Sequence, residues 1–368
     1  MDSRAALKAG TTLRFNDGWE YTITAELARG GGSIVYNAYY IDNLGTKKAV
    51  RIKECYPFRC NLRRSSDGNL LIPETERKLF AQTKQKMCRA YQLGNEFFAA
   101  DGLTNLTANT YNIYEANHTL YVVSVYAQGQ ELSYDRYSSV KDSIAAVKSA
   151  ATAISKIHNK GFLYLDIKPS NILTLEGTTE LIQLFDFDTV VPISDVPELR
   201  DKISFTKGFA ALELQRGDGK RIGTHTDVYG IGALLFYMLF DRVPDAFDCD
   251  AGARYDFSRS KLSGGAYRDA LTFRLTDFFH HTLVDYYLDR FSNMETVVEK
   301  LSELQALADL SARYVVSSKI YEPEFFLGRE QETAWLTQRL LDAPGGCSFL
   351  VGMGGIGKST LARHCIRQ

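Results

Sequence analysis

The chain has 368 residues, of which 45% are hydrophobic and 24% are charged, and this length allows two domains that each bury a core. Its 43 basic and 44 acidic residues nearly cancel, so no net electrostatic field favours nucleic acid or a membrane surface as a partner. The longest apolar run, residues 231–240, is about half as long as a bilayer span, and the N-terminal residues lack the apolar core of a signal peptide. The six cysteines form no CxxC pair, which is typical of reduced thiols. These features predict a soluble protein of the cytoplasm.

The first third of the chain predicts β-strands. Residues 21–28, 33–41, 48–56 and 119–127 are rich in β-branched and aromatic side chains, and breaks of the Gly-rich or Asn-Gly type separate the first three, as turns between strands do. Between the third and fourth segments, the polar, Lys-rich stretch 74–100 has the composition of a helix.

Helices dominate from Ser138 onward. Apolar side chains recur at three- and four-residue spacing along residues 140–157, which predicts an amphipathic helix. The apolar run 231–240 predicts a second helix that is buried. A strand-rich first part followed by a helix-rich remainder indicates an α+β fold with two lobes.

The stretch YLDIKPSNIL, residues 164–173, carries the residue types that phosphoryl transfer needs. That reaction requires metal ions on the phosphates, a positioned acceptor and a carboxylate near the attacking hydroxyl. Asp166 can serve the acceptor hydroxyl, Lys168 can steady the transferring phosphate, and Asn171 can hold one Mg²⁺, because this ion prefers hard oxygen ligands. Asp186 follows an apolar strand in LIQLFDFD and is the second candidate metal ligand.

These two motifs resemble the catalytic loop of eukaryotic-type protein kinases, written H-R-D-x-K-x-x-N, and their Asp-Phe-Gly metal site. The resemblance implies ATP and Mg²⁺ as cofactors and a protein with a Ser or Thr acceptor as the substrate. It also implies a bilobal protein-kinase-like fold over residues 10–312. The small β-rich N-lobe is expected at about 10–127 and the larger helical C-lobe at about 128–312.

The resemblance further implies which residues surround ATP. Strand alternation sends Arg51 and Lys53 to the same face, and Lys53 corresponds to the lysine that holds the α- and β-phosphates. Glu96 is the candidate for its helical ion-pair partner, with a solvated surface glutamate as the alternative. The other expected ATP contacts come from the Gly-rich loop and the adenine pocket: Ala28, Gly30, Ser33, Val35, Ser124 and Leu173.

The substrate side of the resemblance lies further along the chain. FTKGFAALE, residues 205–213, resembles the segment that receives protein substrates, with Thr206 where Ser/Thr-directed kinases have a threonine. Glu213 closes this segment and is expected to pair with Arg290. Asp227 lies in a stretch similar to the central helix of the large lobe and is expected to brace the catalytic loop. This set of motifs is typical of bacterial, eukaryotic-like Ser/Thr protein kinases.

Several positions depart from the kinase pattern. Tyr164 and Leu165 replace the His and Arg of the catalytic loop, and without that Arg a phosphate on the activation loop lacks its charge-assisted partner. Arg51 stands where a small residue usually roofs the adenine, so it either stacks on the base or fills the pocket. Asp188 replaces the glycine of Asp-Phe-Gly. The small Ser124, at the gatekeeper position, predicts an open pocket behind the adenine.

Three functions fit this pattern. An active Ser/Thr kinase is favoured, because the residues expected to hold metal, phosphate and acceptor are all present and the altered positions mostly concern regulation or packing. A pseudokinase that binds nucleotide or a partner without phosphotransfer is the alternative. In a third, weaker interpretation only the nucleotide motif near the end of the chain works.

That second motif is GMGGIGKS, residues 352–359, which follows the apolar segment CSFLV and precedes the helix-forming TLARH. In a P-loop, the amides of the turn and of the helix N-terminus cradle phosphate. Gly352 and Gly357 frame the expected loop, while Lys358 and Ser359 are expected to serve phosphate and Mg²⁺.

Upstream of this motif, FFLGRE at residues 325–330 resembles the entry of STAND-type signalling NTPases of the NACHT or NB-ARC-like kind. Residues 325–368 are therefore expected to be the first fragment of a P-loop α/β unit that is truncated after this motif, and residues 313–324 to be a linker. The resemblance implies a kinase effector controlled by self-association through the missing NTPase region.

Overall fold

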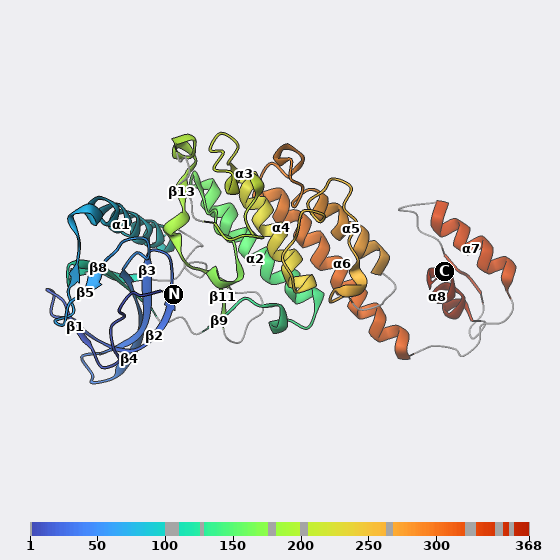
Figure 1. Ribbon diagram of the computed structural model, residues 1–368. Coiled ribbons are helices and arrows are strands. Elements are labelled where there is room, and N and C mark those ends of the chain that lie inside the picture. Colours follow the sequence, from blue (N-terminus) through green and yellow to red (C-terminus); the bar gives the residue numbers. More distant parts are fainter. Residues whose placement is uncertain are drawn as a thin grey trace.

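The structure is a computed structural model with two lobes, a β-rich lobe drawn in blue and a helical lobe drawn in green to orange (Figure 1). Among the described residues, no helix is long and apolar enough to cross a membrane, and the cysteines are free thiols. The described residues are 2–99, 110–125, 129–175, 182–198, 205–262, 268–320, 329–342, 349–352 and 357–367.

The N-lobe contains an antiparallel sheet in the order β1-β2-β3-β4-β8-β7. Helix α1 (Arg77–Ala99) packs beside it (Figure 1). The expected strands and helix are present with ends shifted by a few residues, but β1 and β7 were not predicted. The strands are β1 (Thr12–Arg14), β2 (Glu20–Arg29), β3 (Ser33–Ile41), β4 (Lys47–Cys55), β7 (Thr110–Ala116) and β8 (Thr119–Val125).

Alternation along the strands builds the core of this lobe. Ile34 and Tyr36 of β3 and Val50 and Ile52 of β4 are fully buried on one face of the sheet. Because successive side chains of a strand point to opposite faces, Lys53 lies on the other face. The sheet therefore presents this lysine away from its own core.

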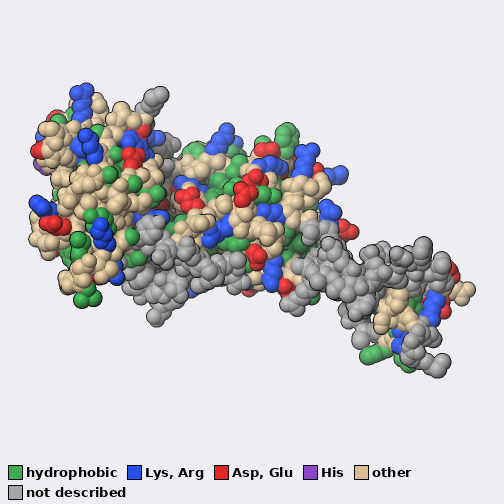
Figure 2. Space-filling model, turned by 90° about the horizontal axis from the view of Figure 1, so that it is seen from below, with side chains coloured by type: hydrophobic (Ala, Val, Ile, Leu, Met, Phe, Trp, Pro, Cys, Tyr) green, Lys and Arg blue, Asp and Glu red, His purple; other side chains and the backbone are tan. Residues whose placement is uncertain are grey.

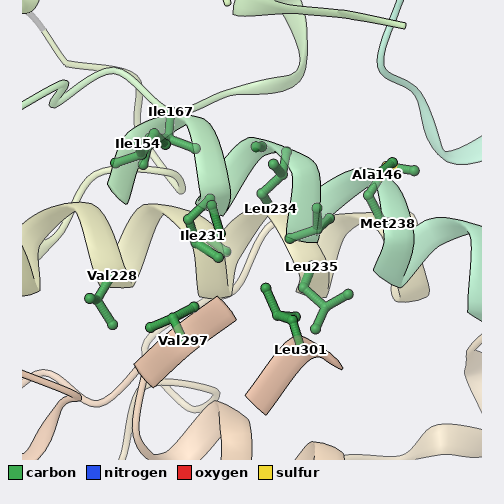
Figure 3. Packing of buried hydrophobic residues seen from close by; sticks show 14 of the residues in the cluster. Ala146, Ile154, Ile167, Val228, Ile231, Leu234, Leu235, Met238, Val297 and Leu301 are labelled. Atoms are coloured by element: carbon green, nitrogen blue, oxygen red, sulfur yellow. The ribbon is translucent and has the colours of Figure 1, made fainter. Parts of the chain in front are cut away.

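Helices α2 (Val140–Asn159), α4 (Thr224–Phe240) and α6 (Met294–Ile320) form the centre of the C-lobe, with α5 (Arg268–His280) packed beside them. Helix α4 is apolar on almost all sides, as expected for a helix surrounded by protein. Figure 3 shows its side chains between those of α2 and the α6 residues Val297 and Leu301. The buried helix predicted around residues 231–240 is thus the centre of this lobe.

The first part of the expected linker at residues 313–324 is helical. Helix α6 continues to Ile320, and residues 321–324 lie outside the described part of the chain. The physical reason is local, since residues 313–320 contain no Gly or Pro to end the helix and Pro323 is the first such residue.

Short strands hold the loops between the lobes. Strands β9 (Gly129–Glu131), β11 (Ile172–Leu175) and β12 (Ile182–Leu184) form one small sheet, and β10 (Phe162–Leu163) pairs with β13 (Val191–Pro192). The stretch between β10 and β11 is the predicted catalytic loop. Two further short strands are β5 (Arg63–Arg64) and β6 (Leu70–Leu71), and α3 (Leu212–Gln215) is a short α-helix.

Near the end of the chain, α7 (Glu330–Asp342) and α8 (Lys358–Arg367) pack on each other. Leu336, Leu361 and Cys365 form their small apolar cluster. The helix expected after the second phosphate motif is present. Within the described residues 349–352 before it, no strand is formed, which differs from the expected strand–loop–helix order.

The molecular surface carries charges of both signs. Figure 2 shows Lys and Arg interspersed with Asp and Glu on the coloured part of one face. This distribution agrees with the nearly equal numbers of basic and acidic residues in the sequence.

Candidate active site

The catalytic loop is held by the buried carboxylate of Asp227, at the start of α4. Asp227 accepts hydrogen bonds from the backbone N–H groups of Tyr164 and Leu165, each at 2.8 Å, and its Oδ2 lies 2.8 Å from Nε2 of His158. Leu165 has a φ of 64°, a left-handed conformation that costs a non-glycine residue about 1–2 kcal/mol. The bonds to Asp227 hold the backbone in this conformation, so the expected brace is formed.

Four polar side chains meet just beyond this bend. Nζ of Lys168 lies 2.6 Å from Oδ2 of Asp166 and 3.2 Å from Oγ1 of Thr206, and the Thr206 hydroxyl donates to Oδ1 of Asp166 at 3.1 Å. Nδ2 of Asn171 donates at 2.9 Å to both the backbone oxygen and Oδ2 of Asp166. Residues 40 positions apart in sequence are thus brought to one carboxylate, which is itself only 8% exposed.

Asp186, the second candidate metal ligand, follows β12 in a left-handed bend with a φ of 59°. The N–H of Phe185 donates to the backbone oxygen of Asn171 at 2.9 Å, which ties this bend to the catalytic loop. One carboxylate and one amide side chain are hard oxygen donors of the kind that Mg²⁺ accepts. The residue types present therefore fit this ion.

Lys53 forms ion pairs with two carboxylates, Asp186 and Asp188, which flank Phe187 in the sequence. Its Nζ lies 2.9 Å from Oδ1 of Asp186 and 2.6 Å from Oδ2 of Asp188. Burial opposes the charged form of Lys53, but both carboxylates raise its pKa, so it is a cation. The charge of Lys53 in turn lowers the pKa of Asp186, whereas burial raises the pKa of Asp188.

The expected pair between Lys53 and Glu96 is not formed among the described residues. Glu96 faces solvent on α1, and it is the sole acidic residue within the helix. Lys53 takes its counter-charges from the Asp-Phe-Asp stretch instead. The sequence showed the extra carboxylate of Asp188 only as a departure from the kinase pattern and did not indicate its pairing with Lys53.

The Gly-rich loop closes a tight turn between β2 and β3. The N–H of Gly30 donates to the oxygen of Ser33 at 2.9 Å, and Ala28 pairs with Val35 in the strand register. A Cβ added to Gly31 would meet no described atom within 4 Å. Packing of the protein therefore does not require this glycine, whereas close approach of a ligand to the backbone does favour one.

The predicted adenine contacts lie on neighbouring strands. Val35 pairs with Lys53 between β3 and β4, and Arg51 pairs with Ser124 between β4 and β8, so the side chains of each pair share a face of the sheet. The guanidinium carbon of Arg51 lies 6.0 Å from the ring centre of Phe185.

Leu173 is 4% exposed and lies on β11, directly after the catalytic loop. It pairs with Gln183 of β12 and Glu131 of β9. The small sheet thus holds this expected floor of the adenine pocket beside the loop that carries Asp166.

Tyr164 has a packing role at the position where the kinase pattern has His. Its hydroxyl donates to the backbone oxygen of Phe185, and its ring meets Phe187 edge to face with centres 5.9 Å apart. Burial raises the pKa of this hydroxyl, which therefore stays a donor. Sequence reasoning identified Tyr164 only as a departure and missed this support for the Asp186 bend.

The expected substrate segment is anchored at its end by a buried ion pair. Nη1 of Arg290 lies 2.8 Å from Oε1 of Glu213, with side-chain exposures of 0% and 3%. The hydroxyl of Thr226 also donates to Glu213 at 2.9 Å. Residues from two other parts of the C-lobe thus hold the end of the segment that carries Thr206.

The second phosphate motif is described in part. Nζ of Lys358 donates to the oxygen of Gly352 at 2.8 Å, and Gly357 has a φ of 82° at the start of α8. Ser359 lies in the first turn of this helix. Residues 353–356 of the motif lie outside the described residues.

Comparison with known proteins agrees with this geometry. Residues 81–256 match the family model of the protein kinase domain. Part of the chain is also similar to Serine/threonine-protein kinase D of Synechocystis sp., with 30% identity over 146 residues that make up 38% of this chain and 28% of the relative. Residues 81–256 are therefore similar to a protein kinase domain, and the relative from Synechocystis sp. is a serine/threonine kinase by name.

Two further similarities come from more distant proteins. Myosin light chain kinase 2 of Oryctolagus cuniculus is 27% identical over 169 residues, which is 44% of this chain and 26% of that protein. The solved structure of PpkA-294 in its apo form has a TM-score of 0.60 at 22% identity, covering 82% of this chain and 99% of that one. This likeness shows the bilobal fold, including the N-lobe strands that precede the family match.

Proposed function

We propose that the protein transfers the γ-phosphoryl group of ATP, with Mg²⁺, to Ser or Thr hydroxyls of a protein substrate. The observation that supports this most directly is the contact between the Thr206 hydroxyl and Asp166, with Lys168 bonded to both. An aliphatic hydroxyl of the protein itself already lies where an acceptor hydroxyl would approach the carboxylate. A substrate Ser or Thr would replace it.

In this mechanism Asp166 accepts the proton of the acceptor hydroxyl while the oxygen attacks phosphorus. Asn171 keeps the carboxylate oriented through its two bonds. Lys168 stabilises negative charge beside the acceptor, and Lys53 does the same on the nucleotide side. Mg²⁺ held by Asp186 and Asn171 would neutralise the phosphates.

Loss of phosphotransfer in single variants tests the proposal. We expect Asp166→Ala to lower kcat by at least about a hundredfold, because the acceptor hydroxyl loses its base. We expect Lys53→Met to weaken mainly the binding of the nucleotide. The assay follows labelled phosphate from ATP to a generic basic protein and to the chain itself. Asp256→Ala and Lys48→Met alter exposed ion pairs and serve as matched controls.

The result also separates the proposal from its alternative. Equal transfer by wild type and both active-site variants would reject the assigned roles. ATP binding without any transfer by the wild type would instead support a pseudokinase that acts as a scaffold.

We further propose that residues 325–368 begin a STAND-like P-loop unit that controls the kinase. The bond from Lys358 to Gly352 at the N-terminus of α8 supports a phosphate-binding turn there. A kinase effector of this kind would act in the cytoplasm and self-associate through its NTPase region.

A further inference from the structure

The N-terminal residues 2–8 are part of the N-lobe rather than a free extension. Arg4 is only 7% exposed and Leu7 equally so. The N–H of Leu7 donates to the Tyr36 hydroxyl at 3.1 Å, and Nε of Arg64 donates to the oxygen of Ala5 at 2.7 Å. This segment is therefore attached to the sheet at several points.

Arg4 reaches from this segment to the Gly-rich loop. Its Nη2 donates to the oxygen of Gly30 at 2.9 Å and its Nη1 to the oxygen of Ser33 at 3.3 Å and to that of Tyr56. Asp2 balances the charge with a contact of 2.5 Å, and the hydrogen bond with Arg4 lowers the pKa of Asp2. One guanidinium thus joins both ends of the turn to the chain that follows β4.

Every carbonyl of the turn is engaged by the protein. Beyond the bonds from Arg4, the oxygen of Gly31 accepts from the N–H of Phe58 at 2.8 Å and that of Gly32 from the N–H of Tyr56 at 3.0 Å. Within the part of the chain that the structure describes, the N–H groups of Gly31 and Gly32 donate to no protein acceptor. Carbonyl oxygens repel phosphate and N–H groups bind it, so this arrangement presents the binding groups outward.

We propose that Arg4 is a positioning residue that locks the Gly-rich loop in its phosphate-binding conformation. The proposal rests on the proposed kinase function. An open loop would have to order itself whenever ATP binds, and that entropic cost weakens binding. Arg4 removes this cost before the nucleotide arrives.

The test compares Arg4→Ala and Arg4→Lys with wild type and with Arg14→Ala. Arg14 belongs to the same sheet, but its side chain is 77% exposed and pairs with Glu20 at the surface. We expect Arg4→Ala to raise the KM for ATP about tenfold while kcat changes less than about twofold, because the loop acts in binding. Arg4→Lys keeps the positive charge but not the planar guanidinium with its several donors. Its KM for ATP should therefore lie between those of wild type and Arg4→Ala.

Hydrogen exchange provides a readout that needs no activity. The N–H groups of Gly30, Tyr56 and Phe58 bond to carbonyls of the turn, and in Arg4→Ala they should exchange about tenfold faster. The amides of α4 should keep their wild-type rates.

Two outcomes would overturn the proposal. Unchanged exchange and unchanged ATP affinity in Arg4→Ala would show that Arg4 does not hold the loop. Faster exchange throughout α4 as well would show that Arg4 supports the whole fold. A wild-type chain without phosphotransfer would reject the proposed function, while exchange rates and ATP binding would still decide about Arg4.

Discussion

At the scale of single residues, Asp188 changes the surroundings of the phosphate-binding lysine. Asp188, two residues after Asp186 in the sequence, places a second carboxylate oxygen 2.6 Å from Nζ of Lys53. A bound metal ion would compete with Lys53 for Asp186. Lys53 could still pair with Asp188. We infer that Asp188 keeps Lys53 in place, a task for which α1 supplies only the solvent-facing Glu96.

Replacement of Asp188 tests this role. We expect Asp188→Gly to raise the KM for ATP about tenfold, because Lys53 loses a hydrogen-bonded counter-charge that is worth about 1.5–3 kcal/mol. Asp188→Asn keeps the shape without the charge and should show an intermediate effect. Steady-state kinetics with varied ATP measures both variants.

Higher phosphotransfer by Asp188→Gly would contradict the inference. It would show that Asp188 withholds Lys53 from the nucleotide. Asp195→Gly removes an exposed carboxylate from the 3-10 helix Ile193–Glu198 and controls for the added backbone freedom.

At the scale of elements, an apolar cluster joins the catalytic loop to residues before, within and after the expected substrate segment. Leu165 is 4% exposed and belongs to one cluster with Val196, Ala210 and Leu214. An arginine at this position would bind a phosphate, whereas this leucine binds other apolar side chains. We therefore expect apolar packing, rather than a bound phosphate, to hold this part of the chain.

We therefore expect Leu165→Ala to lower the free energy of unfolding by about 2–4 kcal/mol, because it removes buried apolar contacts and leaves a cavity. Urea denaturation measures the change. Leu44→Ala is the control, because Leu44 is 89% exposed and its truncation should cost less than about 0.5 kcal/mol. Treatment of the wild type with a protein phosphatase should leave its activity unchanged.

An unfolding free energy unchanged by Leu165→Ala would show that the cluster does not stabilise the segment. Loss of activity after phosphatase treatment would show that phosphate still controls it.

At the scale of the whole molecule, the two lobes precede a separate pair of helices. Helices α7 and α8 form their own small cluster, and Phe349 and Val351 before α8 are 86% and 92% exposed. Apolar residues of a strand before a P-loop, as expected here, normally pack within a sheet. Their exposure is what we expect for the proposed P-loop unit, in which further strands would cover them.

We expect a longer polypeptide with a complete NTPase to become more active as a kinase when it assembles. Activity per chain should rise with the fraction of oligomer across a dilution series, with masses from light scattering. Full activity in a strictly monomeric sample would contradict this prediction. The isolated kinase domain, which lacks the NTPase, should show no such dependence on concentration.

The sequence alone determined the local chemistry of the candidate site. The spacing of Asp166, Lys168 and Asn171 places them within one short loop, and the loop's own geometry brings the side chains together. The main strands and helices were also predictable, because their hydrophobic periodicity is a local property. The helical continuation of residues 313–320 was missed although its cause, the absence of Gly and Pro, was visible.

Only the tertiary structure decided which distant residues meet. Lys53 pairs with Asp186 and Asp188 rather than Glu96, and Arg4 reaches the Gly-rich loop from 26 residues away. Such contacts depend on how α1 and the N-terminal segment pack against the sheet. The spacing of residues in the sequence does not predict these contacts. Each contact becomes favourable only once folding has buried both partners next to each other.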